Sequence, residues 1–97
     1  MLQVRQFGYG LGPGDAHNIL ESALLVERRG FDILRFGDHT LTLMGTEVEY
    51  PGAMAMVTAI GMKTKRIMVS IGVTDPYRRH PMALAQDIAT LDKLTNG

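Results

Sequence analysis

The sequence predicts an α/β protein with a parallel sheet, made of three consecutive strand–helix units. Three short segments with the character of strands, at residues 4–9, 31–36 and 67–73, are each followed by turn residues and then by an apolar pattern of helical spacing. The units recur about every 30 residues. Strands that alternate with helices pair in parallel through right-handed crossovers. Two architectures fit this order: an open doubly wound sheet, or part of a (β/α)8 barrel.

The length of the chain favours the second architecture, with only part of a barrel present. A complete barrel takes about 250 residues, so the 97 residues of this chain would supply about three of the eight units. The chain closes on Asn96-Gly97, a helix-stop signal, where a fourth strand would begin. No linker divides residues 1–97, which we take as one partial domain. We expect a truncated barrel or a chain that needs a partner, because a three-stranded sheet has open edges.

Capping residues set the expected helix boundaries. Asp15 is a suitable N-cap for the first helix, and Gly30 is a natural left-handed stop after it. Pro51 suits the first position of the second helix, and Pro81 suits that of the third. The glycine-rich segment after the first strand is interpreted as a turn. Its members are Gly8, Gly10, Gly12 and Gly14 around Pro13.

Composition excludes several classes of partner. Ten basic and ten acidic residues give a net charge of zero, which argues against nucleic acid or an anionic membrane. The absence of cysteine excludes disulfides and thiolate metal sites. Asp38, His39 and His80 lack the close-spaced ligand pair of metal sites, so no metal is expected. With no signal peptide or membrane span in the pattern, we expect a cytoplasmic protein that acts on a small molecule.

Polar residues gather where the second and third strands end, which is where parallel α/β folds place their functional groups. Asp38 and His39 follow the second strand, and residues 74–80 follow the third. Neighbouring residues on a strand point to opposite faces, so one of the pair can face a cofactor while the other anchors the loop. A histidine there can act as acid, base or hydrogen-bond donor. A capping aspartate with a surface histidine is an equally good interpretation. We expect the side chains of Asp38 and His39 to face the same opening, the mouth at the C-terminal ends of the strands, as residues 74–80.

The glycines after the first strand do not form the dinucleotide-binding pattern G-x-G-x-x-G. Counted from Gly8 the last position is Pro13, and counted from Gly10 it is Asp15. Asp15 would also repel a pyrophosphate at the helix N-terminus. A turn at the mouth of a barrel is therefore the favoured interpretation.

Several segments resemble, in their order and spacing, the luciferase-like monooxygenase superfamily of (β/α)8 barrels, over nearly the whole chain. Residues 72–81, GVTDPYRRHP, look most like its deazaflavin branch, which uses coenzyme F420; methylenetetrahydromethanopterin reductases are the nearest form. The superfamily segments are residues 27–32 (ERRGFD), Gly37-Asp38-His39, Lys65-Arg66-Ile67 with Gly72-Val73, and residues 81–97 ending in ATLDKLTNG.

The resemblance implies hydride transfer between coenzyme F420 and a small organic substrate. It implies that His39 is catalytic and that Asp38, Gly72, Val73 and Thr74 bind the cofactor. In this branch a cis peptide in a bulge of the third strand supports the deazaflavin, and its position here would be Gly72-Val73. A flavin mononucleotide (FMN)-dependent monooxygenase of the same fold is the alternative.

Two positions depart from the resemblance. Gly10 stands where the reductases carry a glutamate thought to handle a proton, and Arg35 stands in the second strand where an aromatic residue is usual. A charge there needs a partner, for example a carboxylate outside this chain. A non-catalytic fragment or assembly module, which belongs to another functional class, is also compatible with the sequence. The open third strand leads us to expect a homo-oligomer.

Overall fold

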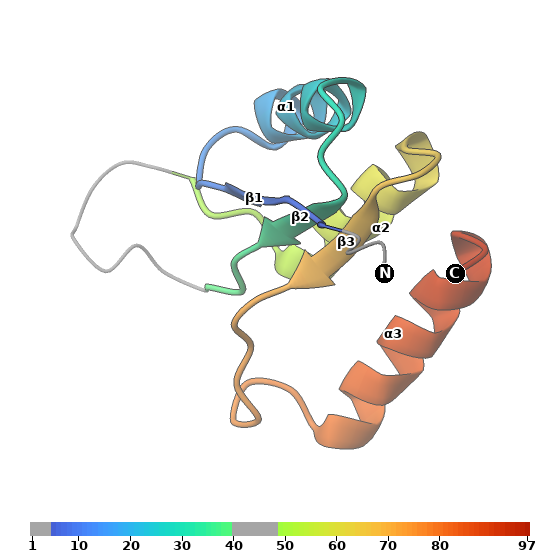
Figure 1. Cartoon of the computed structure of the whole chain (residues 1–97). Coiled ribbons are helices and arrows are strands. Elements are labelled where there is room, and N and C mark those ends of the chain that lie inside the picture. The colour runs from blue at the N-terminus through green and yellow to red at the C-terminus, as the bar shows by residue number, and fades with distance from the viewer. Residues whose placement is uncertain (1–4, 40–48) are drawn as a thin grey trace.

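The computed structural model describes residues 5–39 and 49–97. Within these residues the element order is β1 (Gly8–Leu11), α1 (Ala16–Arg28), β2 (Ile33–Phe36), α2 (Ala53–Lys63), β3 (Met68–Ile71) and α3 (Pro81–Leu94). The strands form one parallel sheet in the order β1-β2-β3 (Figure 1). The predicted α/β class, with three parallel strand–helix units, is confirmed.

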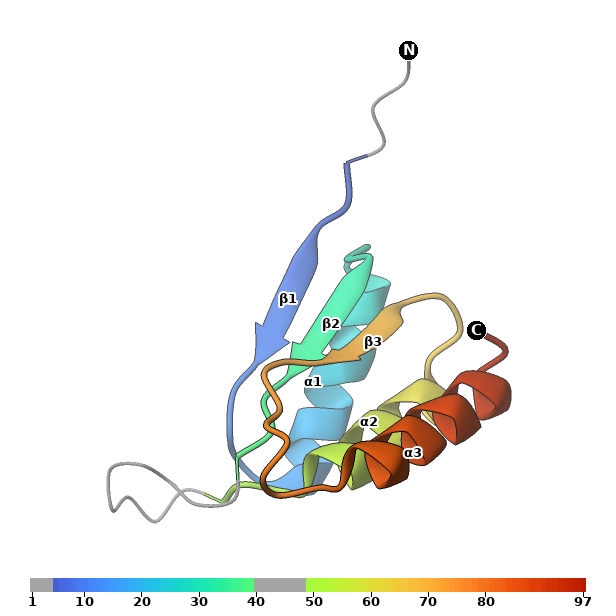
Figure 2. The same cartoon turned by 90° about the horizontal axis from the view of Figure 1, so that it is seen from below.

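Within the described residues, helices cover one face of the sheet. Leu34 and Phe36 of β2 are fully buried, whereas Arg35 between them is exposed. Alternation along the strand therefore puts the two apolar side chains toward the helices and Arg35 on the opposite face. Helices α1 and α2 pack against the sheet, and α3 packs against α2 (Figure 2).

The hydrophobic core lies between β2 and the first two helices. Helix α3 has no buried residue in the described part of the chain, and its Leu91 is half-buried against the core. Helix α3 therefore buries little apolar surface where it packs against the rest of the described chain. The core residues are Ile19, Ala23, Val26, Leu34, Phe36, Ala53, Met56, Val57, Ile60 and Ile67.

Three predicted helix boundaries are confirmed. The Asp15 carboxylate caps α1 by accepting from the backbone N–H of Asn18 at 3.0 Å. Gly30 has a φ of +90°, the left-handed region that favours glycine after a helix. Helix α3 begins at Pro81 as expected. The sequence therefore predicts well those boundaries where one residue type has the required geometry.

Other boundaries were wrong. Pro51 does not begin the second helix, because Gly52 is its N-cap and α2 starts at Ala53. The first strand is Gly8–Leu11; of the predicted range 4–9, residue 4 lies outside the described residues and residues 5–7 are not in the strand, whereas Gly10, predicted in the turn, is. A strand tolerates glycine where another group approaches its backbone closely, and here Arg35 lies against Gly10. The third strand ends at Ile71, before Val73.

Glu27, near the end of α1, ties this helix to the turn that precedes β3. Its carboxylate accepts from the backbone N–H groups of Lys65, Arg66 and Ile67, with the shortest bond to each 2.9, 2.8 and 2.9 Å long. The Arg66 guanidinium donates back to the carbonyl oxygens of Glu27 and Phe31 at 3.2 and 2.9 Å. Burial raises the pKa of Glu27, but these N–H donors and the charge of Arg66 outweigh it and lower the pKa below 4.5.

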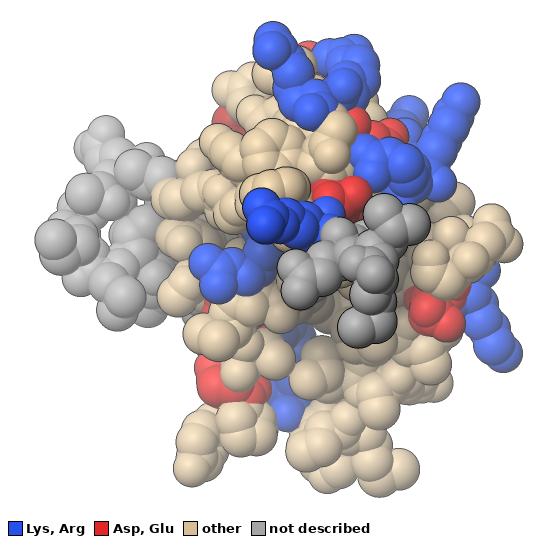
Figure 3. Space-filling model, viewed as in Figure 1, with Lys and Arg blue, Asp and Glu red and all other residues tan. Residues whose placement is uncertain are grey.

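The surface carries mixed charge. Basic and acidic side chains are interspersed over the face shown in Figure 3, without a large area of one sign. Among the described helices none is long and apolar enough to span a membrane.

Candidate functional site

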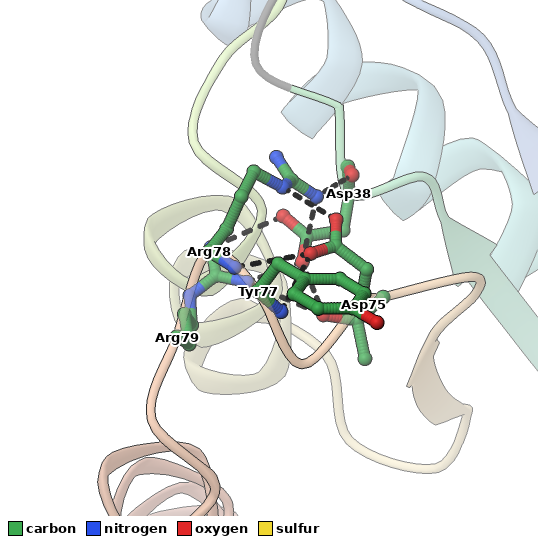
Figure 4. Close-up of polar contacts among 6 residues, drawn as sticks. Asp38, Asp75, Tyr77, Arg78 and Arg79 are labelled. Carbon is green, nitrogen blue, oxygen red and sulfur yellow. Dashed lines mark hydrogen bonds and ion pairs between the residues drawn. The ribbon is translucent and has the colours of Figure 1, made fainter.

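Asp38 is the centre of a polar network at the C-terminal end of β2. The residue is 4% exposed, and its carboxylate takes donors from the loop between β3 and α3 (Figure 4). The Thr74 hydroxyl donates to Oδ2 at 2.5 Å, and Arg79 donates from Nη2 to Oδ1 at 3.1 Å and from Nη1 to Oδ2. Arg78 lies with Nη2 3.3 Å from Oδ2 and donates to the Asp38 carbonyl.

The loop is also held by its own aspartate. The Asp75 carboxylate accepts from the backbone N–H groups of Tyr77 and Arg78, each at 3.0 Å, and from Arg78 Nε at 2.8 Å. Arg78 is thus fixed between Asp75 in its own loop and Asp38 on the neighbouring strand. The result is a loop held by two carboxylates, Asp75 within the loop and Asp38 after the neighbouring strand.

The network keeps Asp38 ionised. Burial raises the pKa of its carboxyl. Hydrogen bonds from Arg79 and Thr74 and the charges of Arg79 and Arg78 lower the pKa by more than this, so that it lies below the ordinary value of 3.8. The hydrogen bond from Arg79 to Asp38 correspondingly raises the pKa of the guanidinium. At neutral pH Asp38 is an anion that holds the loop and not a group that donates a proton.

His39 has a different environment. It is half-buried, and its ring packs edge-on against Tyr50 with centroids 5.0 Å apart. The ring lies over Gly37, where a Cβ would be 3.0 Å from His39 Cδ2. Its nitrogens make no hydrogen bond with the described residues. Asp38 anchors the loop, which both interpretations of the pair allow, and the role of His39 stays a prediction.

The structure brings only some of the predicted site residues into contact. Asp38 and Thr74 meet directly, which confirms the shared mouth for Asp38. The peptide between Gly72 and Val73 is cis, as expected, and Val73 is 75% exposed. His80 turns away, because its Nδ1 accepts from the backbone N–H of Met82 and caps α3.

Sequence reasoning missed the arginines at positions 78 and 79 as the partners of Asp38. The signal was present, since two adjacent cations follow the third strand while a carboxylate ends the second, and parallel neighbouring strands end at the same edge. In the described part of the chain no group of three histidine, aspartate or glutamate side chains could hold a metal ion.

A cleft of about 260 Å³ lies away from this site, between β3 and α3. Apolar side chains from both elements line it, including Ile67, Val69, Ile88 and Leu91. It runs along the open edge of β3 and contains none of the residues predicted to act on a substrate.

A family model described as luciferase-like monooxygenase matches residues 1–97. The chain is 32% identical to an F420-dependent glucose-6-phosphate dehydrogenase of Microbacterium testaceum, over 95% of the chain and 28% of that protein. It is 33% identical to the 5,10-methylenetetrahydromethanopterin reductase of Methanopyrus kandleri, over 94% of the chain and 24% of that protein.

The fold matches solved structures as well. An F420-dependent secondary alcohol dehydrogenase in complex with an F420–acetone adduct superposes with a TM-score of 0.87 at 30% identity, over 95% of this chain and 29% of that chain. The chain therefore spans between 24% and 29% of the length of these relatives.

Proposed function

The chain belongs to the luciferase-like monooxygenase family, in its F420-dependent branch, and on that basis we propose that it forms part of an oxidoreductase that transfers a hydride between coenzyme F420 and a small organic substrate. The observation that carries the proposal is the network around Asp38, which joins the ends of β2 and β3 where parallel barrels place their reactive groups. The relatives are named for a sugar phosphate, a pterin and a secondary alcohol.

The residues at the strand ends fit a planar, partly polar ring. Val73 offers an exposed apolar side chain beside Gly72, and His39 offers ring nitrogens that are not engaged elsewhere in the described chain. Coenzyme F420, when bound, supplies the hydride chemistry, and the protein supplies position and charge.

The roles of the chain's own residues follow from their contacts. His39 is proposed as the catalytic residue, holding or moving a proton at a ring nitrogen. Gly72, Val73 and Thr74 are proposed as cofactor contacts. Asp38, whose oxygens are already bonded to Thr74 and the loop arginines, acts on the cofactor indirectly by positioning Thr74.

Binding titration tests the proposal. Purified chain should quench the fluorescence of coenzyme F420 more strongly than that of FMN, and Val73→Glu should weaken the binding while Tyr77→Glu, in the same loop but away from the predicted contacts, should not. Preference for FMN would favour the monooxygenase alternative. Binding of neither would favour a non-catalytic fragment or assembly module.

We also infer that the chain associates with itself. The edge of β3 is unpaired in the described structure, and Met68, Ile88 and Leu94 are exposed on β3 and α3. An open strand edge with apolar neighbours favours pairing with another chain. Sedimentation velocity should show a mass that rises with concentration. A monomer that unfolds cooperatively at every concentration would contradict this inference.

A further inference from the structure

Arg35 lies in the middle of the open face of the sheet. Its register partners are Gly10 on β1 and Ser70 on β3. Because paired residues of parallel strands share a face, Arg35 stands between two small residues, on the side opposite to the helices. In the barrels that this chain superposes on, the face opposite the helices is the barrel interior.

Two glycines define where the side chain lies. A Cβ at Gly72 would be 2.8 Å from Arg35 Cδ and 3.2 Å from Cγ, so the aliphatic part of Arg35 occupies the space that this glycine leaves. A Cβ at Gly10 would be 3.7 Å from Nη2, so the guanidinium reaches the neighbouring strand. The exposed arginine is thus laid across the open face of the sheet, from Gly72 just after β3 to Gly10 on β1.

No anion among the described residues balances this charge. Arg35 forms no ion pair or hydrogen bond there, and the residues that share its face in register are uncharged: Gly8, Gly10, Ile33, Met68 and Ser70. A guanidinium presents five N–H donors in a planar fork that matches an oxyanion with two oxygens. Inside a barrel such a cation requires an anion.

We propose that Arg35, laid between Gly10 and Gly72, binds the oxyanion of the substrate, a carboxylate or a phosphate monoester. This inference rests on the proposed oxidoreductase function and specifies its substrate class. Arg35 lies against Gly72, one of the proposed cofactor contacts, so the anion would bind close to the place of the reaction. Substrates that carry an oxyanion near the reacting carbon would be selected over neutral alcohols.

Anion titration of the full chain tests the site without coenzyme F420. In nitrogen-15 NMR spectra, inorganic phosphate should shift the Arg35 Nε–H and the amides of Gly10 and Gly72, and chloride at equal ionic strength should not. Arg35→Gln should weaken phosphate binding about fivefold, and Arg35→Lys should weaken it less. Arg29→Gln, which removes an exposed arginine outside this face, is the matched control and should leave it unchanged.

Three results would overturn the proposal. The first is a phosphate response that Arg35→Gln leaves intact. The second is an equal loss in the Arg29→Gln control, which would mean that only net charge matters. The third is a shift of the Arg35 signal on raising protein concentration without phosphate, which would mean that a carboxylate of a second copy supplies the oxyanion. Because phosphate binding is measured without coenzyme F420, failure of F420 binding would be seen separately.

Discussion

At each end of the sheet one carboxylate accepts several hydrogen bonds, but the donors of these two carboxylates differ in kind. Glu27, at the N-terminal ends of the strands, binds three successive backbone N–H groups of the turn between α2 and β3. Asp38, at the opposite end, binds the side chains of Thr74, Arg78 and Arg79. Backbone donors are present whatever the residue types, whereas the second set requires particular ones. The N-terminal end of the sheet, called the lower end below, therefore fixes the position of β3. The C-terminal end, called the upper end, fixes the shape of the loop between β3 and α3 through side-chain contacts.

The largest effect should come from removing the charge of Asp38. Asp38→Asn leaves Arg79 without its anion and Arg78 still paired with Asp75, in a place where the carboxylate is buried, and should lower the free energy of unfolding by about 3 kcal/mol. Urea unfolding measures this loss. Trypsin should also cut faster after Arg78 and Arg79, because the loop is released.

The control for that variant is Asp92→Asn, which changes an exposed carboxylate on α3. It should alter neither stability nor cleavage. If Asp38→Asn proved as stable and as resistant to trypsin as the parent chain, the upper carboxylate would not be what holds the loop.

A smaller loss is expected at the lower end. Glu27→Gln keeps one oxygen that can accept but removes the charge that three backbone N–H groups share, and should cost about 1–2 kcal/mol. Trypsin cleavage after Arg78 and Arg79 should stay at the parent rate, because the loop lies at the other end of the sheet. Glu21→Gln, on the exposed face of the same helix, serves as the reference. Equal loosening of the loop by both anchor variants would remove the distinction between the two ends.

The architecture was predictable from the sequence, and the network was predictable only in part. The periodic apolar runs specify three strands and three helices, since each run has the spacing of its element. Residues 74–80 were also placed opposite Asp38, because parallel strands end together. Which loop side chains meet Asp38 depends on how the backbone folds after Ile71, and no local pattern encodes that. The position of β1 was wrong because its glycines are typical of a turn, whereas Gly8 and Gly10 pair in register with Ile33 and Arg35 of β2.

Acid should weaken the two ends in sequence. The pKa values of both carboxyls are lowered in the folded chain, from 4.5 for Glu27 and from 3.8 for Asp38. A lowered pKa stabilises the fold above the ordinary value, and the contribution is lost as pH falls toward the folded value. Stability should therefore begin to fall near pH 4.5 through Glu27 and fall further below pH 3.8 through Asp38. In a plot of the free energy of unfolding against pH, Asp38→Asn should remove the fall below pH 3.8 and keep the fall near pH 4.5. Loss of the fall near pH 4.5 instead would contradict the assignment.

The smallest effect on stability should come from Gly37→Ala, beside the upper anchor. A Cβ at this position would lie 3.0 Å from His39 Cδ2 and 3.3 Å from Nε2, which is tighter than an ordinary contact, so the imidazole has to shift. Because His39 is only half-buried, we expect the shift to cost less than about 1 kcal/mol in unfolding. It should nonetheless weaken the contact of the ring with Tyr50, seen as a loss of nuclear Overhauser effects between the two rings. Gly12→Ala, which meets nothing within 4 Å, should leave both quantities unchanged. An unaltered ring contact in Gly37→Ala would show that the glycine does not position His39, and the upper end would then owe its order to Asp38 alone.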